Sequence, residues 1–460
     1  MFYLIFLLVG GEDFGGNFEN RTMRLDFFHV GTASEEHFAL DQIVNDGPWA
    51  GNPNHMLDTL NRGKYFFQVQ KDGKSLYSRG FSSIYGEWET TDEATQQWGT
   101  FHESMRFPWP KGPVQVVLQK RDDHNQFQTV WTVAVDPAAR NVNPKALEPI
   151  FPVIPLLKSG DPHQKVDLLV LGDGYTASEQ AKFKQDAERM AGYLFDQEPY
   201  KSRKSDFNVW AIGTVSQESG VSHPHAGKFT RTDLSTQYST FDSERYVLCR
   251  DNRRLRDVAS AAPYEFLLIL VNNQNYGGGG IFGAQATASV NNTYSDYLFV
   301  HEFGHHFADL GDEYYTSQVS YNLGPVTVEP WEPNLTALLD PNQLKWKDLV
   351  AEGTPLPTPW PKETFESHSM EVQKKRAEMR KNKVPEKEME ALFDGQREFE
   401  TKLLGEGPHA GVVGAFEGAG YRGTGYYRPQ ADCIMFTRDK VGFCKVCQRA
   451  ISQIIDQYSR

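Results

Sequence analysis

The stretch that decides the fold of the C-terminal part of the chain is His301–Tyr315, which reads HEFGHHFADLGDEYY. It opens with an HExxH motif. The residues just before it, 297–300, are Tyr-Leu-Phe-Val, and apolar residues continue at Phe307 and Leu310. This pattern predicts a helix with a buried face that begins ahead of the motif.

Residues four apart lie on the same face of a helix, so His301 and His305 can both bind one zinc ion. Glu302 then points to the adjacent side, where it can take a proton from a metal-activated water and pass it to a leaving amine. The alternative is a buried amphipathic helix with two structural histidines. It is less favourable, because burying His-Glu-His without a partner is costly.

A catalytic zinc ion usually has a third protein ligand. Gly311 is a natural helix stop, because glycine tolerates the left-handed conformation. Asp312 and Glu313 follow it directly and could turn back to the metal, whereas Asp309 would still face away. We predict that Asp312 or Glu313 is the ligand, with Asp312 preferred, and that the other carboxylate orients a ligand imidazole. His306 is expected to be exposed or to lie just behind the ligands.

Outward from this motif, the chain divides into an all-β part and an α/β part. Residues 21–137 hold short runs rich in Val, Phe, Thr and Trp, which predict an antiparallel β-sandwich. Residues 138–164 are spaced by proline and predict a linker. Residues 165–460 alternate apolar strands with amphipathic helices, which predicts an α/β layer with a mainly parallel sheet. The charged segment 362–402 has helical composition, broken at Pro385.

A second feature lies about 130 residues after the motif. Cys433-Ile434-Met435-Phe436 resembles the Met-turn of metzincin peptidases, in which a methionine forms an apolar floor beneath the zinc ion. An apolar helix is predicted after it.

Taken together, these features resemble the IgA-peptidase family of metzincin-like zinc peptidases, from about residue 21 to the C-terminus. The resemblance implies an N-terminal β-sandwich followed by a metzincin-like α/β (α+β) catalytic domain. It also implies zinc at His301 and His305 with a carboxylate from the Asp312–Glu313 segment, and Glu302 as general base. The standard pattern HExxHxxGxxH would put Gly at Ala308 and His at Gly311, so the third ligand is inferred rather than matched.

The cysteines leave three alternatives open. Cys433, Cys444 and Cys447 lie close together in sequence, and Cys249 stands apart. The first three could form a disulfide, remain free thiols or bind a second, structural metal ion with a fourth ligand from Cys249 or a histidine. Their spacing resembles that of cysteines after the Met in archaemetzincins, which implies the metal alternative.

Two further segments are candidates for the substrate site. The glycine run 277–280 is interpreted as a flexible rim that leads into an edge strand, 283–290, where an extended substrate could pair with the backbone near Gly283 and Ala284. Tyr421, Tyr426 and Tyr427 precede the Met-turn, and a tyrosine there could donate a hydrogen bond to an oxyanion. The two histidines of Ser222–His225 are interpreted as loop residues.

Composition narrows the classes of function. The 460 residues carry a formal net charge of −13, which argues against a nucleic-acid partner. No apolar run is long enough to span a bilayer. Phe2–Val9 has the length of a signal-peptide core, although no Lys or Arg precedes it, so residues 1–20 predict an export segment and a secreted, periplasmic or cell-surface location.

The hypothesis that follows is a zinc-dependent endopeptidase that cuts extracellular proteins, such as immunoglobulins or surface glycoproteins, as extended chains. One zinc ion is its expected cofactor. The N-terminal domain is expected to bind a glycan or a protein surface. Two alternatives remain: an adhesin-like binding protein on a peptidase scaffold, which the intact Glu302 argues against, and a zinc amidase that acts on cell-wall peptides.

Overall fold

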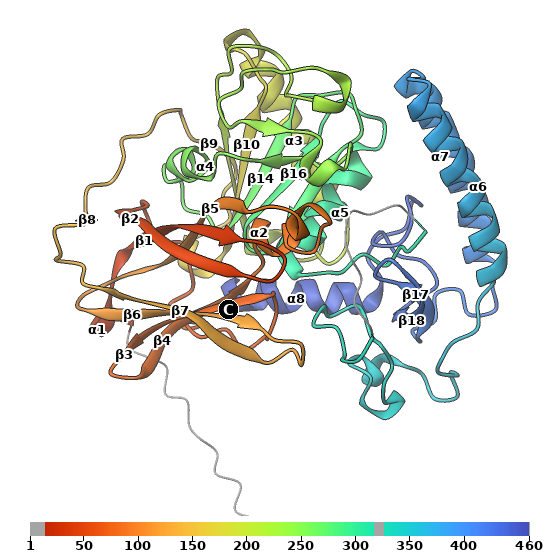
Figure 1. Ribbon diagram of the computed structural model, residues 1–460, viewed down its shortest axis with the longest axis horizontal. Coiled ribbons are helices and arrows are strands. Elements are labelled where there is room, and N and C mark those ends of the chain that lie inside the picture. The colour runs from red at the N-terminus through yellow and green to blue at the C-terminus, as the bar shows by residue number, and fades with distance from the viewer. Residues whose placement is uncertain (1–13, 317–325, 460) are drawn as a thin grey trace, which may run out of the picture.

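A computed structural model describes residues 14–316 and 326–459 of the chain (Figure 1). Residues 1–13, which include the apolar run Phe2–Val9, lie outside the described residues. The short helix α1 (Phe14–Asn17) falls in the predicted export segment, yet Phe14 stacks on Trp49 with ring centroids 4.7 Å apart. The folded N-terminal part therefore includes residues from Phe14 onward. Across the described ranges, no helix is both long enough and apolar enough to cross a membrane.

The N-terminal part is mostly β, as predicted. It consists of two four-stranded sheets, ordered β5-β1-β2-β8 and β4-β3-β6-β7, whose inward side chains share one apolar core. The strands are β1 (Phe18–Gly31), β2 (Glu36–Asn45), β3 (Tyr65–Lys71), β4 (Lys74–Phe81), β5 (Gly99–Pro110), β6 (Val114–Arg121), β7 (Phe127–Val135) and β8 (Val142–Asn143). A short helix, α2 (Ile84–Trp88), connects β4 toward β5.

The proline-spaced segment is more ordered than a linker. Its strand β8 pairs with β2, and its strand β9 (Ile154–Leu157) pairs with the C-terminal sheet. Pro155 lies within β9, which is tolerated because β9 is an edge strand and needs hydrogen-bond partners on one side only. The segment therefore contributes one strand to each part of the molecule.

The C-terminal part is built on a six-stranded sheet, ordered β15-β16-β14-β10-β11-β9. Four central strands are parallel, as predicted, and the two edge strands, β9 and β15, are antiparallel. Alternate residues of a strand point to opposite faces. Leu168 and Val170 of β10 accordingly join the core beneath α3, α5 and α8, while Leu169 and Leu171 join the core beneath α4. The sheet is covered on both faces, which explains its continuous apolar strands.

The remaining bounds are these: β10 (Val166–Asp173), β11 (Phe207–Gly213), β12 (Thr236–Gln237), β13 (Leu248–Cys249), β14 (Phe266–Val271), β15 (Gly278–Ile281), β16 (Gln285–Ser289), β17 (Phe416–Ala419), β18 (Arg422–Arg428), α3 (Gln180–Phe195), α4 (Asn252–Ala259), α5 (Ser295–Ala308), α6 (Lys362–Lys381), α7 (Glu386–Gly405) and α8 (Lys445–Ser459). The break predicted at Pro385 separates α6 from α7. These two helices pack side by side at one end of the molecule (Figure 1).

The two parts are joined by buried polar contacts that converge on the end of α5. Arg62 of the N-terminal part donates hydrogen bonds to the carbonyl oxygens of Ala308 (3.1 Å) and Ala450 (3.0 Å), the first of which ends α5. Asp309 accepts a hydrogen bond of 2.6 Å from the Gly63 N–H. Because a cation near the last carbonyls stabilises a helix end, the N-terminal part helps to fix α5 in place.

Candidate metal centre and its surroundings

Helix α5 carries the HExxH motif and lies directly on edge strand β15, and glycines make this approach possible. A Cβ atom on Gly280 would lie 2.1 Å from the Glu302 carbonyl oxygen and 2.9 Å from the His305 Cβ. A Cβ atom on Gly278 would lie 3.1 Å from the Glu302 Cγ. The glycine run therefore leaves room for the helix, and this role was not apparent from the sequence.

This packing leads to a first testable expectation. Gly280→Ala should push α5 and β15 apart, because no room exists for the added methyl group. Overpacking of this kind destabilises by about 1–3 kcal/mol. We expect urea denaturation to show a loss in that range, together with reduced metal content. Gly192→Ala, at an exposed position of α3, is the matched control. A Cβ atom there meets nothing within 4 Å, so that variant should be as stable as wild type or more so.

The two histidines of the motif are held in one orientation by backbone carbonyls. His301 Nδ1 donates a hydrogen bond of 3.0 Å to the carbonyl oxygen of Ile434, and His305 Nδ1 donates to that of Leu310. A carbonyl can only accept, so each Nδ1 carries a proton, which leaves Nε2 as the nitrogen that can bind a metal ion. The two Nε2 atoms lie 3.2 Å apart. This arrangement is typical of histidines that ligate a metal ion through Nε2.

Asp312 completes a group that could hold a metal ion. Its Oδ1 lies 3.1 Å from His301 Nε2 and 3.2 Å from His305 Nε2, and all three residues are largely buried. Asp312 Oδ1 has no hydrogen-bond partner among the described residues. Zinc lies about 2.0–2.1 Å from nitrogen and oxygen ligands, so a tetrahedral centre would put ligand atoms about 3.3 Å apart. The spacing and the unpartnered oxygen both fit a zinc ion.

The charges around this group favour a cation. Burial opposes protonation of His305, but the adjacent Asp312 carboxylate outweighs burial and raises the pKa of His305 to about 10. Burial would raise the pKa of Asp312, yet His305 and His301 hold it well below its usual range. Burial raises the pKa of Glu302. The group of His301, His305 and Asp312 thus favours the uptake of positive charge.

The turn that carries Asp312 is fixed from several sides. Asn334, which is fully buried, accepts from the Gly311 N–H (2.8 Å) and donates to the Gly311 carbonyl oxygen (2.9 Å). The Glu313 N–H donates a hydrogen bond of 2.9 Å to the carbonyl oxygen of Met435. The Tyr421 hydroxyl donates to Asp312 Oδ2, the oxygen that does not face the histidines. One carboxylate oxygen is thus anchored while the other remains available.

Tyr421 therefore orients the carboxylate, and removing its hydroxyl should loosen the site. We expect Tyr421→Phe to lower metal affinity by about 10–100-fold, the usual effect of losing a partner that orients a ligand. Titration of apoprotein with zinc against a competing chelator would measure it. Tyr427→Phe is the matched control, because Tyr427 is not part of the cavity lining described below. Equal affinities in the Tyr421→Phe variant and wild type would contradict this role.

Met435 lies beneath the centre of the motif. A Cβ atom on Gly304 would sit 3.1 Å from Met435 Sδ, so the methionine packs against the helix between the two histidines. Met435 is fully buried. The same loop supplies the Ile434 carbonyl that orients His301. The loop thus supports the site both as an apolar floor and as a hydrogen-bond acceptor.

A cavity of about 130 Å³ opens over these residues. Its lining includes Glu302, whose carboxylate forms no hydrogen bond within the part of the chain that the structure describes. Sequence reasoning missed several other residues of this lining: Glu87, Arg245, Tyr276, Tyr297 and Tyr314. Glu87 comes from α2, Tyr297 comes from α5, and the other three come from loops. Arg245 Nη2 lies 3.4 Å from the Tyr314 hydroxyl, which brings a fixed positive charge to the cavity wall.

Comparison with known families gives a match over nearly the whole chain. A model of the IgA peptidase M64 family matches residues 154–455, and a model of the Peptidase M64 N-terminus matches residues 13–132. The chain belongs to the IgA peptidase M64 family. It is a metallopeptidase, and a peptide or protein is its substrate class. Comparison with curated proteins found no match.

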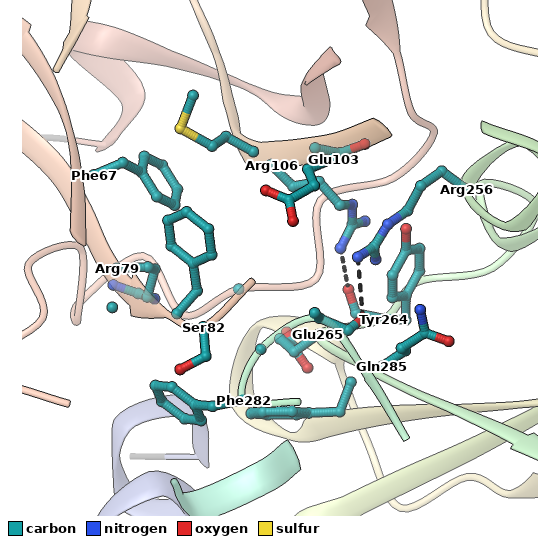
Figure 2. A pocket seen from close by; sticks show the side chains of 18 of the residues that line it. Phe67, Arg79, Ser82, Glu103, Arg106, Arg256, Tyr264, Glu265, Phe282 and Gln285 are labelled. Carbon is teal, nitrogen blue, oxygen red and sulfur yellow. Dashed lines mark hydrogen bonds between the residues drawn. The ribbon is translucent and has the colours of Figure 1, made fainter. Parts of the chain in front are cut away.

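In this M64 peptidase the edge strand is not the one predicted. The segment 283–290 contains β16, an inner strand, whereas the glycine run itself forms the edge strand β15. Gly283 and Ala284 lie in the turn between them and line a different cavity of about 130 Å³, between the N-terminal sheets and the C-terminal sheet. Figure 2 shows that cavity, with Arg106, Arg256 and Glu265 around it. A run of glycines usually indicates a flexible segment, so the sequence analysis placed the edge strand after residues 277–280 and not within them.

Two expectations around the M64 motif need correction. The left-handed residue that ends α5 is Asp309 (φ 52°), not Gly311. Gly311 is needed for space, because a Cβ atom there would lie 2.5 Å from Leu335 Cδ1. His306 is fully buried rather than exposed: its Nδ1 donates to the Ile281 carbonyl oxygen (2.8 Å) and its Nε2 accepts from the Leu267 N–H (3.1 Å). It ties α5 to the sheet.

The tyrosine candidates separate in the structure. Tyr421 lines the cavity over the motif, and Tyr426 lines an adjoining hollow that reaches His305 and Asp312. Tyr427 pairs its backbone with Thr336 and lines neither. The histidines of Ser222–His225 also lie outside both linings. A position close to the Met-turn in the sequence therefore did not by itself show which tyrosines line the cavities beside the HExxH motif.

The cysteines of this M64 peptidase are all free and buried. The disulfide that the sequence left open is not formed. Cys433, Cys444 and Cys447 gather instead around Glu313, the residue after Asp312. The fourth member of the group is thus neither Cys249 nor a histidine.

Proposed function

We propose that this chain is a zinc-dependent endopeptidase, with His301, His305 and Asp312 as metal ligands and Glu302 as general base. The observation that carries the proposal is the convergence of two Nε2 atoms and one unpartnered carboxylate oxygen at 3.1–3.2 Å from one another. The choice of Asp312 over Glu313 is supported by the direction of the two side chains, since Glu313 points to the cysteines.

When bound, the zinc ion polarises a water molecule and the scissile carbonyl. Glu302, in the cavity next to the ligands, takes the proton from the attacking water and delivers it to the leaving amine. Its burial raises its pKa, which makes it a better proton acceptor than an exposed carboxylate. Arg245 supplies positive charge at the cavity wall for the oxyanion. Met435 keeps the ligand helix on an apolar support.

An extended substrate would run along β15. The backbone of Gly278 forms hydrogen bonds with the backbone of Arg245 and Val247. The Phe282 carbonyl oxygen accepts a hydrogen bond from the Ser82 N–H. Gly280, between them, has the same orientation as Gly278, because alternate residues of a strand turn their N–H and C=O groups to the same edge. Its outward groups have no backbone partner within the described ranges. We propose that they bind the substrate backbone beside the metal.

The N-terminal part supports substrate placement. Glu87 of α2 lines the cavity and accepts a hydrogen bond from the Tyr246 hydroxyl. We propose that the N-terminal part positions protein substrates by binding a glycan or a protein surface on them. The apolar run Phe2–Val9 supports action outside the cytoplasm, on extracellular proteins such as immunoglobulins or surface glycoproteins.

Substrate class can be tested with a panel. We expect the purified protein to cut an unfolded protein and internally quenched peptides at internal bonds, with activity lost on treatment with a zinc chelator such as phenanthroline and restored by added zinc. A non-chelating isomer of the same compound is the control. Cleavage of cell-wall peptides alone would favour the amidase alternative and contradict the proposal.

A further inference from the structure

Three cysteines and one glutamate form a compact buried group beside the motif. One ligand atom from each of Glu313, Cys433, Cys444 and Cys447 lies within 4.8 Å of every other. The four side chains come from three places in the chain: the turn after α5, the loop with Met435, and the start of α8. All four residues are at most 4% exposed. Residues 120 or more positions apart have thus been brought together in the protein interior.

The distances suit a metal centre. Cys433 Sγ and Cys447 Sγ lie 3.9 Å apart, and Glu313 Oε1 lies 3.4 Å from Cys447 Sγ and 4.0 Å from Cys444 Sγ. With Zn–S of about 2.3 Å and Zn–O of about 2.0 Å, tetrahedral geometry puts two sulfurs about 3.8 Å apart and a sulfur and an oxygen about 3.5 Å apart. The observed separations fall close to these values.

Glu313 provides an independent reason for a cation here. Its Oε2 is buried without a hydrogen-bond partner in the described part of the chain, and its Oε1 is held by Asn334 Nδ2 at 2.9 Å. Arg428, the buried guanidinium on the neighbouring strand β18, donates to carbonyl oxygens of Gly418 and Ala431 and forms no ion pair with Glu313. A buried carboxylate with one unpartnered oxygen is costly, and a metal ion would compensate it.

Two of the three sulfur atoms also accept hydrogen bonds from backbone N–H groups. Cys433 Sγ accepts from the backbone N–H groups of Cys444 (3.2 Å) and Met435 (3.5 Å), and Cys444 Sγ accepts from that of Cys447 (3.4 Å). Cys444 and Cys447 lie at the N-terminus of α8, a 15-residue helix whose positive end favours negative charge. Backbone donors to sulfur are usual around metal-bound cysteines, where they stabilise the thiolate.

We propose that Cys433, Cys444, Cys447 and Glu313 bind a second, structural zinc ion. Three thiolates and one carboxylate select zinc among the common divalent ions, because soft sulfur ligands disfavour magnesium and calcium. Four protein ligands leave no open position, which is typical of a structural site rather than a catalytic one. This inference is independent of the proposed function.

The second ion would support the first site. Asp312 and Glu313 are neighbours, so the metal that holds Glu313 also limits where Asp312 can lie. The Glu313 N–H donates to the Met435 carbonyl, and the next carbonyl back, of Ile434, orients His301. The second zinc ion therefore joins α8, the Met435 loop and the turn after α5 into one rigid support for the motif.

Elemental analysis of tag-free protein, loaded with zinc and dialysed, tests the inference. We expect about two zinc ions per chain in wild type and about one in Cys447→Ser, since each tetrahedral group holds one ion. The double variant His301→Ala/His305→Ala should also retain about one, which separates this inference from the proposed function. Cys249→Ser is the matched control, because Cys249 is a buried free cysteine outside the group, and it should keep both ions.

Cobalt substitution tests the same group in a variant that keeps all cysteines, so a folding defect in Cys447→Ser does not affect the result. In the double histidine variant, with all cysteines present, bound cobalt should show a near-ultraviolet sulfur-to-metal charge-transfer band. Glu313→Gln should keep that band but lose the metal to a weaker chelator than wild type does. A wild type with one metal ion, no sulfur band in the histidine variant, or a disulfide among the three cysteines would each overturn the inference.

Discussion

Glu302→Gln should reduce kcat/KM for a peptide substrate by about 100- to 10,000-fold, the range that a positioned general base contributes. The amide keeps the size and shape of the side chain but cannot accept the proton of the attacking water. Glu302 is not one of the three groups that converge on the metal position. Metal content and the thermal midpoint of unfolding should therefore stay at wild-type values.

The comparison that makes this result specific is Glu188→Gln on α3. Glu188 is exposed on that helix, where it forms an ion pair with Lys184. That variant should keep full activity, since exposed pairs of this kind contribute little. Stopped-flow or steady-state assays with one quenched peptide would measure both variants. A Glu302→Gln enzyme that retains a tenth or more of wild-type activity would remove Glu302 from the role of general base.

The second large effect is expected at Asp312. Asp312→Asn replaces the carboxylate ligand with a neutral amide, so the concentration of free zinc needed for half-maximal activity should rise by more than about 100-fold. The structure offers a stringent comparison in the next residue. Glu313→Gln should shift that concentration far less, because the Glu313 carboxylate faces the cysteines and not the two histidines.

Zinc-buffered activity titrations of both variants would decide which carboxylate is the third ligand. Activity of Asp312→Asn should return in excess zinc, whereas that of Glu302→Gln should not. The opposite ranking, with Glu313→Gln more sensitive to zinc than Asp312→Asn, would transfer the ligand role to Glu313.

Much of the fold followed from local patterns. Short Val- and Phe-rich runs predicted the β-rich N-terminal part, and continuous apolar strands predicted the parallel sheet. The boundary at Pro385 also followed, because proline cannot continue a helix. These features depend on neighbours in sequence, and local periodicity reports them directly. The proline-spaced segment was harder to interpret, because its two short strands are defined by the sheets that they join.

The glycine run shows where local patterns fail. Four successive glycines were interpreted as a flexible rim, yet Gly280 is required because α5 occupies the space where a side chain would lie. The same holds for Gly311, whose missing Cβ makes room for Leu335. In both cases the constraint comes from an element distant in sequence, and nothing near the glycine reveals it.

The sequence by itself determined that His301 and His305 share one face of a helix with Glu302 beside them, because a four-residue spacing has one geometric outcome in an α-helix. Only the tertiary structure placed Asp312 beside the two histidines and Glu313 among three cysteines, and brought the Ile434 carbonyl to His301. The reason is physical. Helical periodicity is set by backbone geometry within a few residues, whereas these contacts depend on how packing brings together segments that lie more than a hundred residues apart.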